Sequence, residues 1–364
     1  MKKKRRLGLF FLQLVVSVCL LAYLLWRTND DQGPSTLLSN FPDWDFWTIF
    51  WIVAALALTM LSFVAATFRW SQMVHAIGLK EKFNRLFSHF MAGQFTSNFL
   101  PTSIGGDIVR IARLHKDVKD APKSFTSVVF ERLSGWIALP ILILVGFAID
   151  PGMRSLGSQS RTVFILALVT LASLAVVVFV VGHEVVGRRL GRHKGLLRYI
   201  HALHQGLESL KNNRRDALGL IAAALIYQFV LVLSARCAIA ALGIEGVSIT
   251  AVMVFLPAVL IAQVLPISIG GFGVREGLMV FFLSSLGVSD SEATLFGLVL
   301  GILTLLASLV GVIPLVFGWK KREEAAILQD LAEGEAALSE VAHSPQDADS
   351  YNSRDSAEVD RATS

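Results

Sequence analysis

The series of long apolar stretches is the feature that most limits how this chain can fold. Apolar residues dominate roughly 7–27, 46–68, 83–104, 124–149, 161–182, 214–242, 248–288 and 292–319. Most of these stretches have the roughly 20 residues that an α-helix needs to cross the hydrocarbon core of a bilayer. With 54% hydrophobic and 17% charged residues, the chain lacks the polar surface of a soluble domain. The sequence therefore predicts an all-α polytopic membrane protein.

The basic residues indicate the orientation of the chain. Five Lys and Arg residues at 2–6 precede the first apolar stretch, eight fall within 183–215, and three follow the last stretch at 320–322. The connection 28–45 instead holds four Asp and almost no basic residue. By the positive-inside rule, both termini and 183–215 are cytoplasmic. No small-residue cleavage site follows 7–26, so we expect an uncleaved signal anchor in a multi-pass protein of the inner membrane.

One apolar stretch conflicts with this orientation. The span 46–68 should end in the cytoplasm, and a further crossing by 83–113 should then lead outside. The next connection nevertheless carries Arg110, Arg113 and three lysines. The conflict disappears if 83–113 enters from the cytoplasm, breaks at Pro101 and the following Gly-Gly pair, and returns. The alternative is a full span with a weak charge bias.

An eleven-residue element occurs twice in the apolar sequence. Residues 100–110 read LPTSIGGDIVR and residues 265–275 read LPISIGGFGVR, with eight identical positions. The second copy belongs to the stretch 248–288, which must start and finish outside. This stretch is either a re-entrant hairpin from the outside or two short spans. We predict about six full spans plus two Pro/Gly-broken re-entrant helical hairpins that form an inverted internal repeat, an arrangement that transporters often use.

The residue types of the repeat point to a site for an anion. Proline stops a helix, and Gly-Gly permits positive φ and close approach of the backbone to a ligand. New helices are expected to begin near Asp107 and Phe272, with free N–H groups that favour an anion. Arg110 and Arg275, expected in the first turns, add forked donors suited to the phosphate of a lipid head group. The alternative is that Pro and Gly only shape turns while the arginines reach the interface.

Other charged residues inside apolar stretches are also candidates. Glu131-Arg132 is either a functional pair or a charge pair at the cytoplasmic interface. Arg236 lies deeper, with Gln228 on nearly the same face, and needs a lipid or an acidic partner. Within the apolar sequence the acidic candidates are Asp107, Glu131 and Glu276. Asp107 either binds the substrate or is only the N-cap residue of its helix.

Two further segments have a polar character. Leucine and isoleucine recur every three or four residues at about 195–211, which predicts a cytoplasmic amphipathic helix within a membrane domain of residues 1–322. The tail 323–364 is rich in Ala, Glu, Asp and Ser, and we expect it to be disordered. Cys19 and Cys237 provide no disulfide framework or metal spacing, so no cofactor is expected.

Three motifs together resemble a known family. GQFTSNFLPTSIGGDIVRIARL at 93–114, ERLSG at 131–135 and LPISIGGFGVREG at 265–277 are similar to the membrane domain of lysylphosphatidylglycerol synthases, which also occurs alone as a flippase-like family. The resemblance covers most of 7–320. It implies movement of a phospholipid or isoprenoid-linked lipid between leaflets. The separate domain that performs aminoacyl transfer in the synthases is not found in this sequence, so synthase activity is not expected.

The residues and the resemblance together predict a lipid transporter that is not an enzyme. Its partners would be the bilayer, a membrane lipid substrate and enzymes of lipid or glycan synthesis, with no nucleic acid. The alternatives are a non-transporting partner in lipid or glycan assembly and an intramembrane lipid-phosphate enzyme. The predicted substrate-binding residues are Asn98, Pro101, Ser103, Gly105, Gly106, Asp107, Arg110, Glu131, Arg132, Arg236, Pro266, Ser268, Gly270, Gly271, Arg275 and Glu276.

Overall fold

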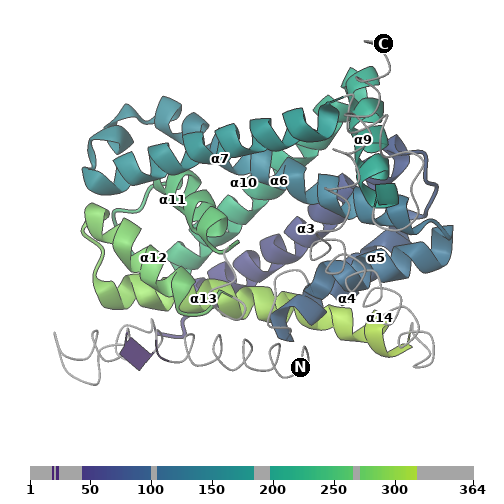
Figure 1. Cartoon of the computed structure of the whole chain (residues 1–364). Coiled ribbons are helices and arrows are strands. Elements are labelled where there is room, and N and C mark those ends of the chain that lie inside the picture. The colour runs from purple at the N-terminus through teal and green to yellow at the C-terminus, as the bar shows by residue number, and fades with distance from the viewer. Residues whose placement is uncertain are drawn as a thin grey trace, which may run out of the picture.

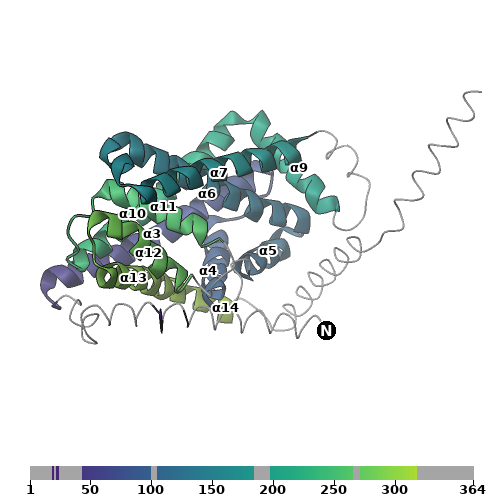
Figure 2. The same ribbon diagram turned by 60° about the vertical axis from the view of Figure 1, so that its left-hand side comes forward.

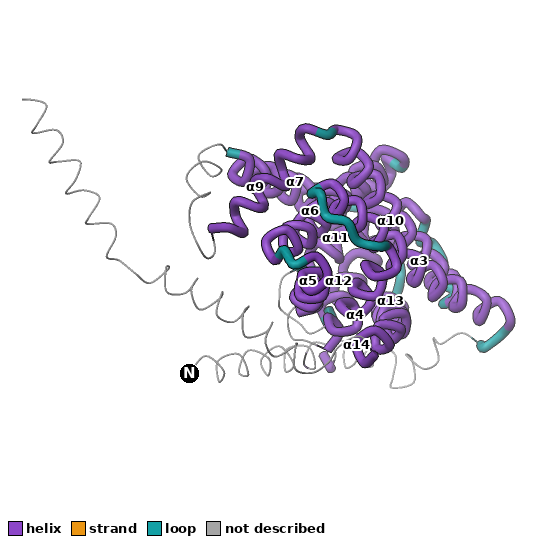
Figure 3. The backbone as a smooth tube through the Cα atoms, turned by 90° about the vertical axis from the view of Figure 1, so that its right-hand side faces the viewer, coloured by secondary structure: helices purple, strands orange, loops and turns teal. Residues whose placement is uncertain are grey.

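The computed structural model describes residues 19, 22–23, 43–99, 105–183, 197–264 and 271–317. Every regular element within these ranges is a helix (Figures 1 and 3). Five helices are long and apolar enough to cross a membrane. The predicted all-α polytopic class is therefore confirmed.

The long helices reproduce the predicted spans. They are α3 (Phe46–Ala76), α6 (Ala121–Ile149), α7 (Ser158–Gly182), α10 (Arg214–Ala241) and α13 (Asp290–Ser308), which continues through η3 (Leu309–Gly311) and α14 (Val312–Phe317). These match five of the six expected full spans, while the stretch 7–27 lies outside the described residues apart from three positions. α3 extends eight residues beyond the predicted end of its span at 68, which places Arg69 inside the helix.

The surface of the bundle is apolar, and its interior contains polar side chains. On α7, Phe179 is 72% exposed and Val176 is 61% exposed. Between α3 and α10, Thr59 and Ser234 are buried and share a hydrogen bond of 2.8 Å. In water, a protein would instead expose polar side chains and bury apolar ones. The apolar exposed faces therefore suit a lipid surrounding.

The first broken element forms a helical hairpin of α4 (Phe83–Phe99) and α5 (Gly105–Val118). Its base is closed by Asp117, which lies 2.7 Å from His89 Nε2 and 3.6 Å from Arg85 Nη1. α3 ends just before this base, and α6 begins just after it. The hairpin therefore returns the chain to the end of the bundle at which it started, as predicted.

The second broken element is a hairpin from the other end. It consists of α11 (Ile249–Ala262), α12 (Val274–Leu283) and η2 (Ser284–Leu286). Thr250 at its start donates a hydrogen bond of 3.1 Å to Asp150, the C-cap of α6. The chain then returns to the same end, where α13 begins. Figure 1 shows α11 and α12 at the left end of the bundle and α4 and α5 at the right.

The internal repeat is larger than the eleven-residue motif. α3 ends at Ala76 and α10 at Ala241, and α5 ends at Val118 and α12 at Leu283, so both pairs of ends lie 165 residues apart. This is also the spacing of the two sequence motifs. The segment α3–α6 thus corresponds to α10–α13. α3 and α10 are antiparallel neighbours, as equivalent helices of an inverted repeat should be.

The predicted amphipathic helix is α9 (Leu197–Asn212). Its apolar side chains Leu207 and Leu210 pack in one cluster with Met73 and Phe130. The Ser209 hydroxyl donates a hydrogen bond of 2.6 Å to the Ala76 carbonyl. Figures 1 and 2 both show α9 on the same side of the bundle as α5. The expected tail 323–364 lies outside the described residues.

Candidate functional site

The first Gly-Gly pair brings two helices together. A Cβ added to Gly106 would lie 3.0 Å from the Gly93 carbonyl carbon, and one added to Gly93 would lie 2.7 Å from the Gly106 carbonyl oxygen. Gly105 and Gly106 are helical residues without positive φ, so the expectation of positive φ is wrong for this pair. Close packing of α4 on α5 explains Gly93 and Gly106. In the second copy Gly271 does have a positive φ of 78°.

The helices after the breaks begin two residues away from the expected positions. α5 begins at Gly105 rather than near Asp107, and α12 begins at Val274 rather than near Phe272. Arg110 is therefore in the second turn of α5 and not the first, whereas Arg275 is in the first turn of α12. The N-cap interpretation of Asp107 is also wrong, because this residue lies inside the first turn and its carboxylate contacts arginines.

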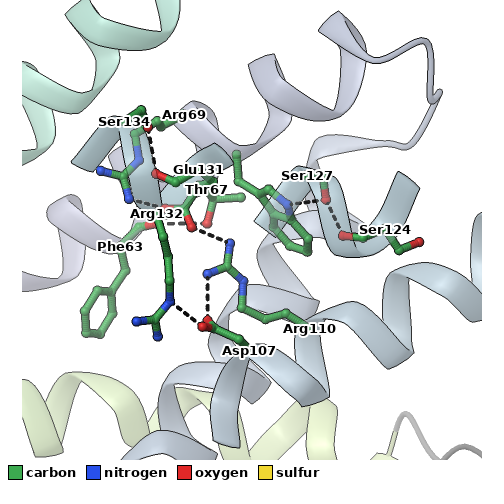
Figure 4. Close-up of polar contacts among 11 residues, drawn as sticks. Phe63, Thr67, Arg69, Asp107, Arg110, Ser124, Ser127, Glu131, Arg132 and Ser134 are labelled. Carbon is green, nitrogen blue, oxygen red and sulfur yellow. Dashed lines mark hydrogen bonds and ion pairs between the residues drawn. The ribbon is translucent and has the colours of Figure 1, made fainter. Parts of the chain in front are cut away.

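Arg110 points from α5 into the bundle interior. Its guanidinium carbon lies 4.3 Å from the ring centroid of Trp70 and 4.8 Å from that of Phe90. Its Nη2 is 3.1 Å from Glu131 Oε2, and its Nη1 is 3.6 Å from Asp107 Oδ1. The side chain therefore joins the two acidic residues through one planar group, as Figure 4 shows.

Glu131 is the centre of the site. It lies on α6 and is 1% exposed. Arg69 from α3 donates a hydrogen bond to its Oε1, while Arg110 lies beside its Oε2. The Arg69 guanidinium also stacks over the ring of Tyr227 on α10, 4.8 Å from the centroid. Glu131 is thus bound by arginines from two different helices, which excludes a simple interfacial charge pair.

Asp107 and Arg132 form the outer part of the site. Arg132 Nε pairs with Asp107 Oδ2, and the two side chains are 37% and 10% exposed. The charge cluster thus consists of Arg69, Asp107, Arg110, Glu131 and Arg132, drawn from α3, α5 and α6 (Figure 4). The structure brings together four of the predicted residues.

The charge cluster has more positive than negative groups. Three arginines face two carboxylates, which leaves a formal charge of +1 when all are ionised. Arg69 Nε and Nη1 and Arg110 Nε and Nη2 are buried and make no hydrogen bond with the described residues, and Glu131 Oε2 is likewise buried without one. Arg110 Nη2 is near Glu131 but is not aligned for a hydrogen bond. Buried donors normally find partners, so the cluster has the capacity to bind oxygen atoms of an anion.

The second Arg of the repeat has a different environment. Arg275 Nη2 is 2.9 Å from Oε1 of its neighbour Glu276, which is fully buried. Glu276 Oε2 accepts a hydrogen bond of 2.6 Å from the Gly273 amide. A Cβ at Gly301 of α13 would lie 3.1 Å from Arg275 Nη1. This pair is neutral and packed, and no described ion pair connects it to the charge cluster.

The 165-residue correspondence shows that the charge cluster is not duplicated. The equivalents of Arg69 and Asp107 are Ser234 and Phe272. α13 begins 169 residues after the start of α6, so the counterparts of Glu131 and Arg132 lie within residues 296–301, none of which is charged. Only Arg110 has a charged counterpart, Arg275. The two halves therefore share a scaffold, while the net-positive site belongs to the first half.

Arg236 does not belong to the charge cluster. It is half-buried on α10, two residues after Ser234, whose hydroxyl donates a hydrogen bond of 2.9 Å to the Ala55 carbonyl. Ala55 and Arg69 are separated by about 21 Å along α3 at 1.5 Å per residue. Arg236 forms no ion pair with another described residue. The acidic residues expected to pair with it are already bound by other arginines, so the predicted pairing of Arg236 with one of them is wrong.

The remaining predicted site residues lie near the ends of the hairpins. Asn98 on α4 donates a hydrogen bond of 2.6 Å to Ser308 on α13. α13 thus contacts the first hairpin at Ser308 and the second at Gly301. Pro101, Ser103, Pro266, Ser268 and Gly270 lie outside the described residues.

The sequence interpretation missed three residues that line the charge cluster. Arg69 lies one residue beyond the predicted span 46–68, because helix length cannot be determined from hydropathy alone. Trp70 and Tyr227 bind arginine through their rings, a geometry without a local sequence pattern. The dipeptide Arg69-Trp70, which directly follows the apolar stretch 46–68, was the available signal.

No group of three or more His, Cys, Asp or Glu side chains in the described part of the chain could hold a metal ion.

Comparison with known proteins agrees with the motif resemblance. The model of the lysylphosphatidylglycerol synthase TM region matches residues 10–311. A UPF0104 membrane protein of Methanothermobacter thermautotrophicus is 21% identical over 358 residues, which covers 88% of this chain and 95% of that protein. The chain therefore belongs to the family of the lysylphosphatidylglycerol synthase transmembrane region.

Proposed function

We propose that this protein moves a lipid with an anionic or modified head group, a phospholipid or an isoprenoid-linked lipid, between the leaflets of the inner membrane. The charge cluster would bind the phosphate while the apolar tails remain in the bilayer. Both termini would be cytoplasmic, and the protein would act as a transporter and not as an enzyme. Enzymes that make or use the same lipid would be its partners.

The observation that carries this proposal is the buried excess of arginine. Charged side chains within a membrane are costly, and those present usually serve a substrate or ion pathway. A purely structural network would be expected to balance its charges and satisfy its donors, whereas this network has one positive charge in excess and buried donors that make no hydrogen bond. An anionic lipid would supply both the missing charge and the acceptor oxygens.

The position of the charge cluster supports the same proposal. It lies between a re-entrant hairpin and two long helices, α3 and α6. In transporters, substrate sites are commonly formed where broken helices of two inverted repeats meet, and movement of one half against the other exposes the site alternately. The hairpins of this chain start from opposite ends of the bundle and both contact α13.

Reconstitution in liposomes tests the proposal. Fluorescent phosphatidylglycerol, phosphatidylcholine and polyprenyl phosphate are incorporated, and loss of inner-leaflet protection from a membrane-impermeant quencher is followed. We expect transport of at least one anionic lipid. Arg110→Lys keeps the charge but loses the fork and the stacking on Trp70, and we expect the rate to fall about tenfold. Wild-type protein that matches empty liposomes for every lipid would refute the proposal.

Arg236→Gln is the matched control. It removes an arginine from an apolar helix without touching the charge cluster, so transport should stay near the wild-type rate. Equal losses from Arg110→Lys and Arg236→Gln would show that the assay reports general damage to the bundle.

A further inference from the structure

The charge cluster has a closed part and an open part. Arg69 and Glu131 are 7% and 2% exposed at their side chains and belong to the closed part. Arg132 is 37% exposed and pairs with Asp107 at the edge. Because the closed pair is held between three helices, any exchange of partners with a ligand must begin at Arg132 and Asp107.

Asp107 is bound loosely on one side. Its Oδ1 lies 3.6 Å from Arg110 Nη1, whereas a charge-assisted hydrogen bond is about 2.7–2.9 Å long. Arg110 is nine-tenths buried and retains Nε and Nη2 donors without a hydrogen bond. The Asp107 carboxylate thus balances charge near Arg110 but leaves the hydrogen-bonding capacity of the Arg110 guanidinium unused.

The position of Asp107 is also a favourable position for an external anion. Asp107 is the third residue of the fourteen-residue helix α5, beside the first-turn amides and the positive end of the helix dipole. Two guanidinium groups, of Arg110 and Arg132, face this point. A phosphate diester carries the same single negative charge as the carboxylate but offers more acceptor oxygens.

We propose that Asp107 is an internal counter-ion that the phosphate of an anionic lipid head group displaces from Arg132 and Arg110. This inference rests on the proposed function and names the residue that competes with the substrate. In the free protein Asp107 keeps two arginines paired. In the lipid-bound state the phosphate takes over that role and offers oxygen atoms to Arg110 Nη1 and Arg132 Nε, the two atoms that face Asp107. Competition by Asp107 weakens lipid binding and thereby promotes release.

Removal of the Asp107 charge is the direct test. Purified protein in a non-ionic detergent is titrated with dihexanoyl phosphatidylglycerol, dihexanoyl phosphatidylcholine and inorganic phosphate, and binding is measured by calorimetry. For Asp107→Asn we expect the Kd of the phosphatidylglycerol to fall about tenfold, because a like charge leaves the anion position. Arg132→Gln should raise the same Kd about tenfold. Asp43→Asn removes one negative charge from an exposed position outside the helices and should leave it unchanged.

The outcomes separate the inference from the proposed function. Unchanged or weaker phosphatidylglycerol binding by Asp107→Asn, with wild-type thermal stability, overturns the counter-ion role even if the wild type transports lipid. If Asp107→Asn destabilises the fold, Asp107→Ser removes the same charge. If Asp107→Asn or Asp107→Ser binds phosphatidylglycerol more tightly but the wild type moves no lipid in liposomes, the counter-ion inference is supported and the proposed transport function is refuted. Phosphate bound as tightly as the lipid overturns the assignment to a lipid head group.

Discussion

Replacement of Glu131 by glutamine should destabilise the protein more than any other single change of a carboxylate to an amide in the described helices. Glu131 is 1% exposed and contacts Arg69 and Arg110 from two other helices. Its neutralisation raises the formal charge of the cluster from +1 to +2 within an apolar surrounding. Breaking a buried ion pair by removing one partner costs about 3–5 kcal/mol, since the remaining charge is uncompensated.

The size and shape of glutamine reduce this cost slightly. Its side-chain carbonyl can still accept a hydrogen bond from Arg69, and one such bond contributes about 1 kcal/mol. The expected loss in the free energy of unfolding is therefore about 3 kcal/mol. The double variant Arg69→Gln/Glu131→Gln should lose less than the sum of the single variants by about 1–3 kcal/mol, because each single variant leaves its partner unpaired.

Unfolding by sodium dodecyl sulfate in mixed micelles measures these differences. Helix content follows global unfolding by circular dichroism, and tryptophan fluorescence adds a local signal because Trp70 stacks on Arg110. Glu208→Gln serves as the control. It makes the same substitution in an exposed pair with His204 on α9, where the Glu208 side chain is 58% exposed, and should cost less than about 1 kcal/mol.

Two results would refute the reasoning. If Glu131→Gln is no less stable than Glu208→Gln, Glu131 is not the buried centre of an ion network. If the losses of Arg69→Gln and Glu131→Gln simply add in the double variant, the two side chains do not interact. Either result would also contradict the charge cluster on which the proposed lipid site depends.

Three further predictions follow from the fold. Gly106→Val should separate α4 from α5 and cost about 3 kcal/mol, whereas Ala222→Val on the exposed face of α10 should be nearly neutral in the same unfolding assay. Gly271→Ala should cost about 1 kcal/mol, since its φ of 78° disfavours a Cβ. In a cysteine-free background, Arg85→Cys should react with an impermeant thiol reagent only from the cytoplasmic side and Ser248→Cys only from the other. Labelling of both from one side would contradict the inverted hairpins.

Much of the fold follows from local properties of the sequence. Five of the apolar stretches form single long helices, because length and hydropathy are sufficient to define a span where no Pro/Gly break occurs. The hairpin at 83–113 was predictable because Arg110 and Arg113 follow a stretch that would otherwise lead to the wrong side. Helix ends were less predictable. α3 continues through Arg69 to Ala76 because packing against α9 and α10 stabilises turns that hydropathy alone does not favour.

The site was predictable as separate residues but not as a cluster. Asp107, Arg110, Glu131 and Arg132 were each identified because ionisable residues in apolar sequence are costly. Their pairing depends on how α5 and α6 cross, and Arg69 joins Glu131 across 62 residues of sequence. Arg236 satisfied the same local criterion but lies elsewhere. A single sequence identifies costly residues, whereas only the tertiary structure shows which of them compensate one another.

The two halves of the repeat differ in the charged residues that they carry. If both copies bound substrate alike, the second half would need counterparts of Glu131 and Arg132, but residues 296–301, where α13 aligns with that pair, are all uncharged. Arg275 is neutralised by its neighbour Glu276, so it has no charge to offer an anion without breaking a buried pair. The duplicated fold therefore provides two hairpins from opposite ends but one net-positive site. In a transporter built this way, the first hairpin would hold the head group, and the second would change access from the opposite side.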